Sequence, residues 1–146
     1  MGDEGHGRQE VAQPLDRCRV LVVEDESLIA MDLDGFLRRA GCEVVGPVGR
    51  VEAATRRIAD RPPDLALLDV NLGGGETVFP LADALAALRV PFVFLTGYEP
   101  EALPERFRQR PIVSKPYSAK RLLAMLAEAV GSGGRAMGPS GGGAAA

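Results

Sequence analysis

The stretch Leu65-Ala66-Leu67-Leu68-Asp69-Val70-Asn71 decides the fold, because it predicts a buried strand that ends in an acid. Its apolar run follows the breaker pair Pro62-Pro63 and is typical of a short strand covered on both faces, as in a parallel sheet. In open α/β sheets, ligands bind at the carboxyl ends of the strands, where Asp69 falls. The glycine run at 73–75 is predicted to let the backbone fold closely over whatever Asp69 holds.

Three further apolar segments also end in polar side chains. Segment 20–23 precedes Glu24 and Asp25, segment 90–95 precedes Thr96, and segment 111–114 precedes Lys115. If these strands lie side by side in one parallel sheet, their polar ends converge on one rim. Two carboxylates about 4 Å apart repel by roughly 4 kcal/mol at an effective dielectric near 20, so the acids favour proton uptake or a bound cation.

The residue types at this rim indicate phosphoryl chemistry. An oxygen-only site suits Mg2+, which binds one or two protein carboxylates and keeps waters that a phosphate displaces. The hydroxyl of Thr96 and the ammonium of Lys115 are the donors that a phosphoryl group on Asp69 requires.

Helical patterns separate the apolar strands. Ser27 is predicted to cap the first helix and Gly41 to end it, while Ser118 is predicted to cap the last helix and Gly131 to end that one. This alternation of strand and helix predicts an α/β fold with a doubly wound parallel sheet.

The segment between Tyr98 and Arg110 breaks the pattern. Pro100 and Pro104 leave room only for a short helix around 105–108, because proline inside a helix costs about 3 kcal/mol. We expect this helix to be mobile and to become ordered on phosphorylation.

From Arg19 to about Val130, the spaced motifs described above resemble the receiver domains of two-component response regulators. The resemblance implies a CheY-like, flavodoxin-like fold, in which a five-stranded parallel sheet of order 2-1-3-4-5 carries helices on both faces. It implies a stand-alone receiver at 18–130, and we expect flexible tails at 1–17 and 131–146.

The resemblance also implies roles for the rim residues and for partners. Asp69 matches the phosphoacceptor, Thr96 the family's hydroxyl and Lys115 its lysine. Mg2+ is implied to bind Asp25, Asp69 and the backbone carbonyl of Asn71, with Glu24 acting through water. The implied partners are a sensor histidine kinase or phosphotransfer protein and a downstream protein target. Such a protein is a phosphoacceptor that supports its own phosphotransfer and autodephosphorylation, not an enzyme in the usual sense.

One position departs from the usual family pattern. Many receivers carry Tyr or Phe three residues before the lysine, where this chain has Ile112. The segment Phe94-Leu95-Thr96-Gly97-Tyr98 resembles the Phe-Ala-Thr-Gly-X motif of a receiver subclass that lacks this switch aromatic, with Leu95 in place of Ala. Tyr98 either packs over its loop, which we favour, or replaces the switch aromatic.

Composition fits a cytoplasmic protein. The 146 residues are 46% hydrophobic and 25% charged, with no apolar run near 18 residues and no signal-peptide pattern, so we expect no membrane span. The net charge of -3 argues against a nucleic-acid partner. Cys18 and Cys42 have no metal-ligand spacing and are interpreted as free thiols near the opposite end of the sheet from the acids.

The sequence is also compatible with two other functions. A receiver-like interaction module that is never phosphorylated is the first, although such modules usually lose an acid or the lysine. A phosphatase with an aspartate nucleophile is the second, because Asp69-Val70-Asn71 resembles a D-x-D strand. That class normally has an acid where Asn71 stands and a cap domain.

Overall fold

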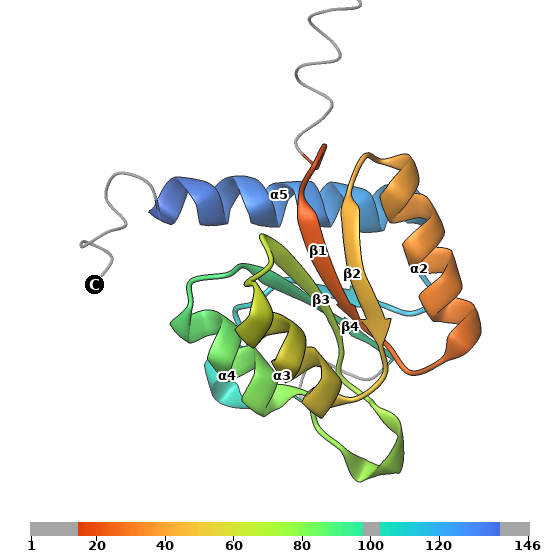
Figure 1. The fold of residues 1–146 in the computed structure, drawn as a ribbon, viewed down its shortest axis with the longest axis vertical. Helices are drawn as coiled ribbons and strands as arrows, with labels where there is room; N and C mark the ends of the chain where they lie inside the picture. Colours follow the sequence, from red (N-terminus) through yellow and green to blue (C-terminus); the bar gives the residue numbers. More distant parts are fainter. Residues whose placement is uncertain (1–14, 98–102, 138–146) are drawn as a thin grey trace, which may run out of the picture.

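Five parallel strands form one sheet in the order β2-β1-β3-β4-β5 (Figure 1). The computed structural model describes residues 15–97 and 103–137. The strands are β1 (Arg19–Val23), β2 (Glu43–Val48), β3 (Leu65–Asp69), β4 (Phe92–Thr96) and β5 (Ile112–Ser114). The predicted doubly wound, flavodoxin-like fold is confirmed.

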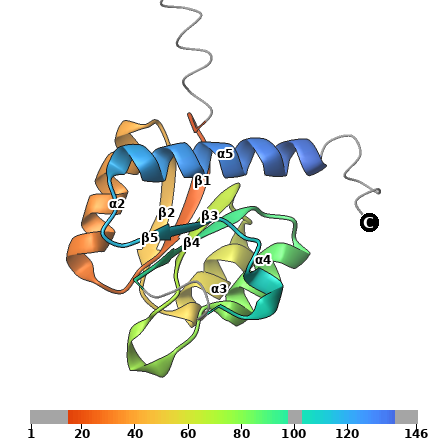
Figure 2. The ribbon, with the colours of Figure 1, turned by 180° about the vertical axis from the view of Figure 1, so that it is seen from behind.

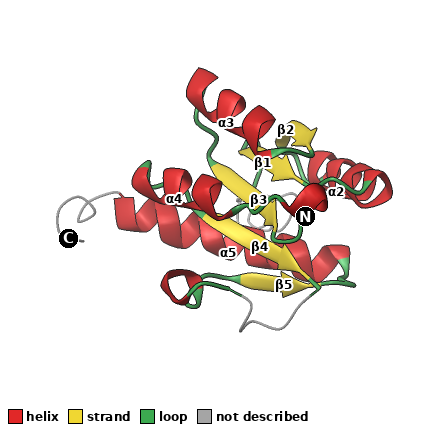
Figure 3. Ribbon diagram, turned by 90° about the horizontal axis from the view of Figure 1, so that it is seen from below, coloured by secondary structure: helices red, strands yellow, loops and turns green. Residues whose placement is uncertain are grey.

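Two helix layers cover the two faces of the sheet. Helices α2 (Ser27–Arg39) and α5 (Ala119–Met137) pack on one face, and α3 (Val51–Asp60) and α4 (Phe79–Ala87) pack on the other (Figures 2 and 3). Leu67 of β3 faces the first layer and Leu68 the second, and both are fully buried. The apolar run therefore reflects burial on both sides of the strand. Across residues 15–97 and 103–137, no helix has the length and apolar content needed to cross a membrane.

Local sequence signals account for two of the four predicted helix ends, those at Gly41 and Ser118. Gly41 follows α2 with φ +95°, a conformation that glycine adopts without steric cost. The hydroxyl oxygen of Ser118 accepts a hydrogen bond from the Arg121 N–H at 3.1 Å, so the predicted cap of α5 is confirmed. Ser27 is instead the first helical residue of α2, and Glu26 occupies the capping position without a side-chain hydrogen bond.

Two predicted boundaries are wrong. Leu15 is 4% exposed and belongs to the core, so the folded part begins before residue 18. Helix α5 passes Gly131 and continues to Met137. A helical glycine costs about 1 kcal/mol relative to alanine, which does not by itself end a helix. The remainder of the predicted tails, 1–14 and 138–146, lies outside the described residues.

The segment before β5 contains a single turn of 3-10 helix, η3 (Glu105–Phe107). This confirms that the helix predicted near 105–108 is short. Phe107 is 2% exposed, and the Arg106 guanidinium makes two hydrogen bonds of 2.9 Å to the carboxylate of Asp83 on α4. Tyr98 and Pro100 lie outside the described residues.

The two cysteines lie at the start of neighbouring strands. The Glu43 N–H donates to the Cys18 carbonyl at 2.9 Å, which places Cys18 beside Cys42 at the amino-terminal edge of the sheet. Both thiols are free, as predicted, and both are buried. Burial raises the pKa of Cys18 to about 12 and that of Cys42 to about 11, so both stay protonated at neutral pH.

Candidate functional site

Strand register brings the polar residues of three strands to one rim. Val23 pairs with Leu68 across β1 and β3, and Asp69 pairs with Leu95 across β3 and β4. Glu24 follows Val23 at the end of β1, and Thr96 follows Leu95 at the end of β4. These two strands flank β3, so Glu24 and Thr96 lie on the two sides of Asp69. The convergence that the sequence predicted is therefore a direct result of parallel pairing.

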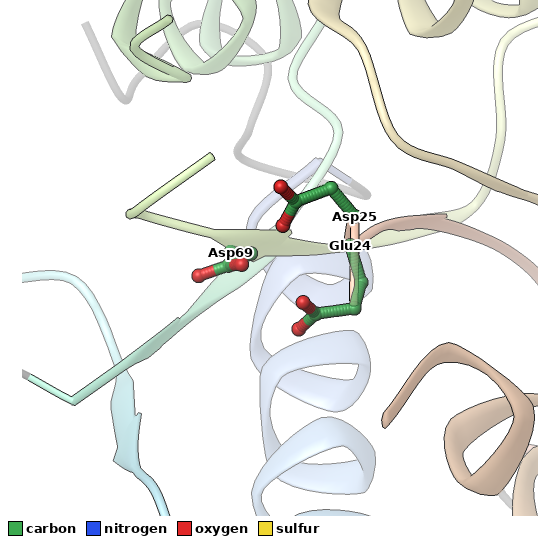
Figure 4. Close-up of side chains that lie close together, drawn as sticks. All are labelled: Glu24, Asp25 and Asp69. Atoms are coloured by element: carbon green, nitrogen blue, oxygen red, sulfur yellow. The ribbon is translucent and has the colours of Figure 1, made fainter. Parts of the chain in front are cut away.

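Three carboxylates gather at this rim. The side chains of Glu24, Asp25 and Asp69 each offer an oxygen within 4.8 Å of the others, around one shared space (Figure 4). Glu24 is 3% exposed and Asp69 is 1% exposed, while Asp25 is open to solvent. Glu24 Oε1 and Asp69 Oδ2 are buried and accept no hydrogen bond from the described residues. Buried oxygens of this kind normally have a partner, so the space suits a cation or a donor.

Lys115 supplies the positive charge of the site. Its Nζ lies 3.5 Å from Asp69 Oδ1, 3.4 Å from Glu24 Oε1 and 3.7 Å from Glu26 Oε1. Burial alone would lower the pKa of Lys115, but the neighbouring carboxylates outweigh burial and raise the pKa above its usual value. Lys115 therefore stays protonated and available to bind an anion.

The buried position of Glu24 changes the pKa of its carboxyl group. Burial raises the pKa of Glu24 to about 7, against the lowering effect of the Glu26 N–H, which donates to Glu24 Oε2 at 3.1 Å. Nearby Asp69 raises this pKa further, and Lys115 lowers it. Burial of the carboxyl group is therefore the main reason why Glu24 is a weaker acid than an exposed glutamate.

Two backbone segments approach Asp25. The Gly73 N–H donates to Asp25 Oδ2 at 2.8 Å, and a Cβ atom on Gly73 would lie 2.7 Å from that oxygen. A Cβ atom on Gly49 would lie 3.2 Å from Cβ of Asp25. The glycine run was expected to fold closely over whatever Asp69 holds, and in the structure Gly73 is the glycine of this run that approaches the site, where its neighbour is Asp25. Around Gly74 and Gly75, the space where a Cβ would lie is open.

Asn71 and Thr96 occupy the remaining predicted positions. The Asn71 N–H donates to Asp69 Oδ1 at 3.0 Å, so the backbone turns immediately beside the acid. Thr96 is 2% exposed at the end of β4, and its carbonyl accepts a hydrogen bond from the Lys115 N–H at 2.8 Å. That backbone bond fixes the start of the Lys115 side chain next to Thr96.

Ile112 lies where many receivers carry an aromatic residue. It pairs with Phe94 across β4 and β5 and packs partly buried against the core on the α3 and α4 face. That core holds a cluster of four aromatic rings, Phe79, Phe92, Phe94 and Phe107, in which the rings of Phe94 and Phe107 each contact the other three.

Sequence reasoning missed one participant, Glu26. Its carboxylate lies 3.7 Å from Lys115 Nζ, and its side chain is 64% exposed. The acidic run Glu24-Asp25-Glu26 was the available signal, but its pattern does not show which acid faces the lysine of a distant strand.

The donor set fits a hard cation. The side chains of Glu24, Asp25 and Asp69 all offer carboxylate oxygens. One oxygen of Glu24 and one of Asp69 are buried and lack a hydrogen bond from the described residues. Mg2+ prefers oxygen ligands and retains several waters, which the exposed side at Asp25 permits.

The comparisons with known proteins agree with this geometry. The family model described as "Response regulator receiver domain" matches residues 20–127. The chain belongs to this family.

Individual relatives support the receiver assignment. The solution structure of SdrG from Sphingomonas melonis Fr1 is 44% identical, with a TM-score of 0.69, and the match covers 80% of this receiver and 97% of SdrG. The transcriptional regulatory protein PdtaR of Mycobacterium tuberculosis is 33% identical over 115 residues, covering 77% of this receiver and 56% of PdtaR. The phyllosphere-induced regulator PhyR of Methylorubrum extorquens is 33% identical over 120 residues, and the match covers 76% of this receiver and 43% of PhyR. This receiver thus spans about half the length of these curated relatives.

Proposed function

We propose that this receiver accepts a phosphoryl group on Asp69 from a sensor histidine kinase or phosphotransfer protein in the cytoplasm. It then signals through contacts with a downstream protein. The observation that carries the proposal is the arrangement of Asp69, whose buried Oδ2 lacks a hydrogen bond while Lys115 Nζ lies 3.5 Å from Oδ1.

The transfer forms one bond and breaks one bond. A carboxylate oxygen of Asp69 attacks the phosphorus of a phosphohistidine, the P–O bond forms, the P–N bond breaks, and the imidazole nitrogen takes up a proton. Lys115 and the hydroxyl of Thr96 donate hydrogen bonds to the phosphoryl oxygens. Water later attacks the acyl phosphate and releases inorganic phosphate, which restores the Asp69 carboxylate.

The cation site belongs to the same proposal. Asp25, Asp69 and the backbone carbonyl of Asn71 would hold Mg2+, with Glu24 acting through water. When bound, the ion supplies charge neutralisation for the phosphoryl oxygens and the crowded carboxylates. In its absence, Lys115 is the cation nearest to the buried acids in the described structure.

A surface beside the site is suited to the phosphohistidine-bearing partner. Leu28 and Met31 on α2 are 78% and 67% exposed, which is unusual for large apolar side chains. Next to them, a groove of about 600 Å³ lies between α2 and the segment after β5, and Lys115 and Tyr117 help to line it. We propose that an apolar helix surface carrying the histidine docks here, within reach of Asp69.

Intact-mass measurement after incubation with Mg2+ and acetyl phosphate tests the phosphoacceptor. We expect a labile gain of one phosphoryl group by the wild type and by Asp34→Ala, which removes an acid in the middle of α2. Asp69→Ala should gain none, and chelation of Mg2+ should suppress the gain by the wild type. No gain by the wild type, even from a histidine kinase, would favour the interaction module, and sustained turnover of a generic phosphate ester would favour the phosphatase.

A further inference from the structure

The loop between β3 and α4, residues 70–78, is attached to the rest of the protein at several points. It carries Asn71, whose carbonyl is a proposed cation ligand, and Gly73, whose N–H donates to Asp25. Leu72 and Val78 are 2% and 0% exposed and pack in the core on the α3 and α4 face. The apolar contacts fix the two ends of the loop, and its polar contacts fix the part nearest the site.

Glu76 makes a polar contact on the far side of this loop. Its Oε2 accepts a hydrogen bond of 3.3 Å from the N–H of Val51, the first residue of α3. Arg50, at the capping position of α3, provides no side-chain hydrogen bond. Glu76 therefore satisfies an N–H group that the helix cannot satisfy itself, and its negative charge lies at the positive end of the helix dipole.

The backbone of the loop links Glu76 to Asn71. Asn71 and Thr77 form an antiparallel bridge, which makes residues 71–77 a small hairpin. Gly74 and Gly75 at its tip have φ of +75°, and a Cβ on either would meet no atom within 4 Å. The tip is thus open, while the base is held at Asp25 on one side and at α3 on the other.

We infer that Glu76 is a positioning residue for the cation site. By holding the hairpin against the amino end of α3, it sets the place of the Asn71 carbonyl and of the Gly73 N–H that orients Asp25. This inference rests on the proposed function, because Mg2+ is the ligand whose affinity it concerns. Glu76 itself acts through the backbone of the hairpin and does not touch the ion.

Calorimetric titration of the full chain with Mg2+ tests this role. We expect Glu76→Ala to bind Mg2+ about tenfold more weakly than the wild type, the lower end of the range for residues that support metal ligands. Glu76→Gln should stay close to the wild type, because its amide oxygen can still accept from Val51. The matched control is Glu52→Ala, which removes an exposed carboxylate from the first turn of the same helix.

Other outcomes overturn the inference. Equal weakening by Glu76→Ala and Glu76→Gln would mean that only the negative charge matters, and unchanged affinity in both would mean that the contact has no role. Hydrogen exchange of the Gly73 amide in the metal-free protein is a second readout, and we expect it to accelerate in Glu76→Ala alone. Failure of the wild type to bind Mg2+ would contradict the proposed cation site, whereas unchanged Gly73 exchange in Glu76→Ala would overturn the role of Glu76.

Discussion

Lys115 Nζ lies 3.5 Å from Asp69 Oδ1, although β5 and β3 are separated in the sheet by β4. The Lys115 side chain therefore reaches across the end of the intervening strand. The hydrogen bond from its N–H to the Thr96 carbonyl fixes where that reach begins. A backbone hydrogen bond thus makes neighbours of Thr96 and Lys115, the two residues proposed to donate to the phosphoryl group.

We expect Lys115→Ala to reduce the rate of phosphorylation by acetyl phosphate about 100-fold, as is typical when one donor to developing charge is removed. Phosphorylated protein can be followed over time by intact mass. Lys120→Ala, an exposed lysine in the first turn of α5, should react at the wild-type rate. A wild-type rate for Lys115→Ala, with Mg2+ binding intact, would remove the lysine from the proposed chemistry.

Gly73→Ala should weaken Mg2+ binding by displacing Asp25. The new Cβ would lie 2.7 Å from Asp25 Oδ2, which is closer than carbon and oxygen can pack, so either the carboxylate or the loop must move. We expect a Kd at least about tenfold higher by calorimetric titration, a loss of the size seen when metal ligands are misplaced.

The matched control is Gly35→Ala, which adds the same methyl group within α2 and meets only the flexible end of Arg39. It should leave the Kd for Mg2+ unchanged. If Gly73→Ala binds as tightly as the wild type, the position of Asp25 does not depend on close approach by this loop.

Features encoded locally could be predicted from the sequence. Buried strands produce apolar runs, and parallel pairing then requires their carboxyl ends to meet, so the sequence predicts that Asp69, Thr96 and Lys115 lie at one rim. The turn at Gly41 was equally local, because left-handed backbone favours glycine.

Features that depend on loop conformation could not be predicted. The hydrogen bond from Gly73 to Asp25 spans 48 residues, and that from Val51 to Glu76 spans 25. Neither the spacing of apolar residues nor a helix-capping residue indicates which atoms of two distant loops form a hydrogen bond. The passage of α5 beyond Gly131 was also missed, because a glycine ends a helix only where the backbone turns left-handed.

The turn η3 should exchange amide hydrogens faster than α5. It is a single 3-10 turn in a segment with two prolines, and the Phe107 and Arg108 N–H groups donate to Pro104 and Glu105 without a longer helix to support them. Hydrogen exchange read by NMR should show these two amides less protected than that of Leu126. Equal protection of the amides in η3 and α5 would contradict this prediction. It would mean that the buried Phe107 ring stabilises the turn against local opening as well as packing stabilises the long helix.

Tyr117 should make the protein less stable at alkaline pH. Its ring packs edge-on against Phe36 at 6.1 Å, and burial, with the nearby acids Glu24 and Asp32, raises the pKa of Tyr117 to about 12. In the unfolded chain a tyrosine ionises near pH 10. Between about pH 10 and pH 12 the folded state thus binds more protons than the unfolded state, and the free energy of unfolding falls as the pH rises.

Urea unfolding of Tyr117→Phe across this range should show a shallower loss of stability than the wild type. Phenolate absorbance of Tyr98→Phe, in which Tyr117 is the remaining tyrosine, gives the pKa directly. The buried cysteines Cys18 and Cys42 titrate in the same region, so their serine variants serve as the reference background for both measurements. A pKa near 10 for Tyr117 would contradict this prediction. It would mean that the Tyr117 hydroxyl is fully hydrated in the groove beside Lys115, although the Tyr117 ring packs against Phe36.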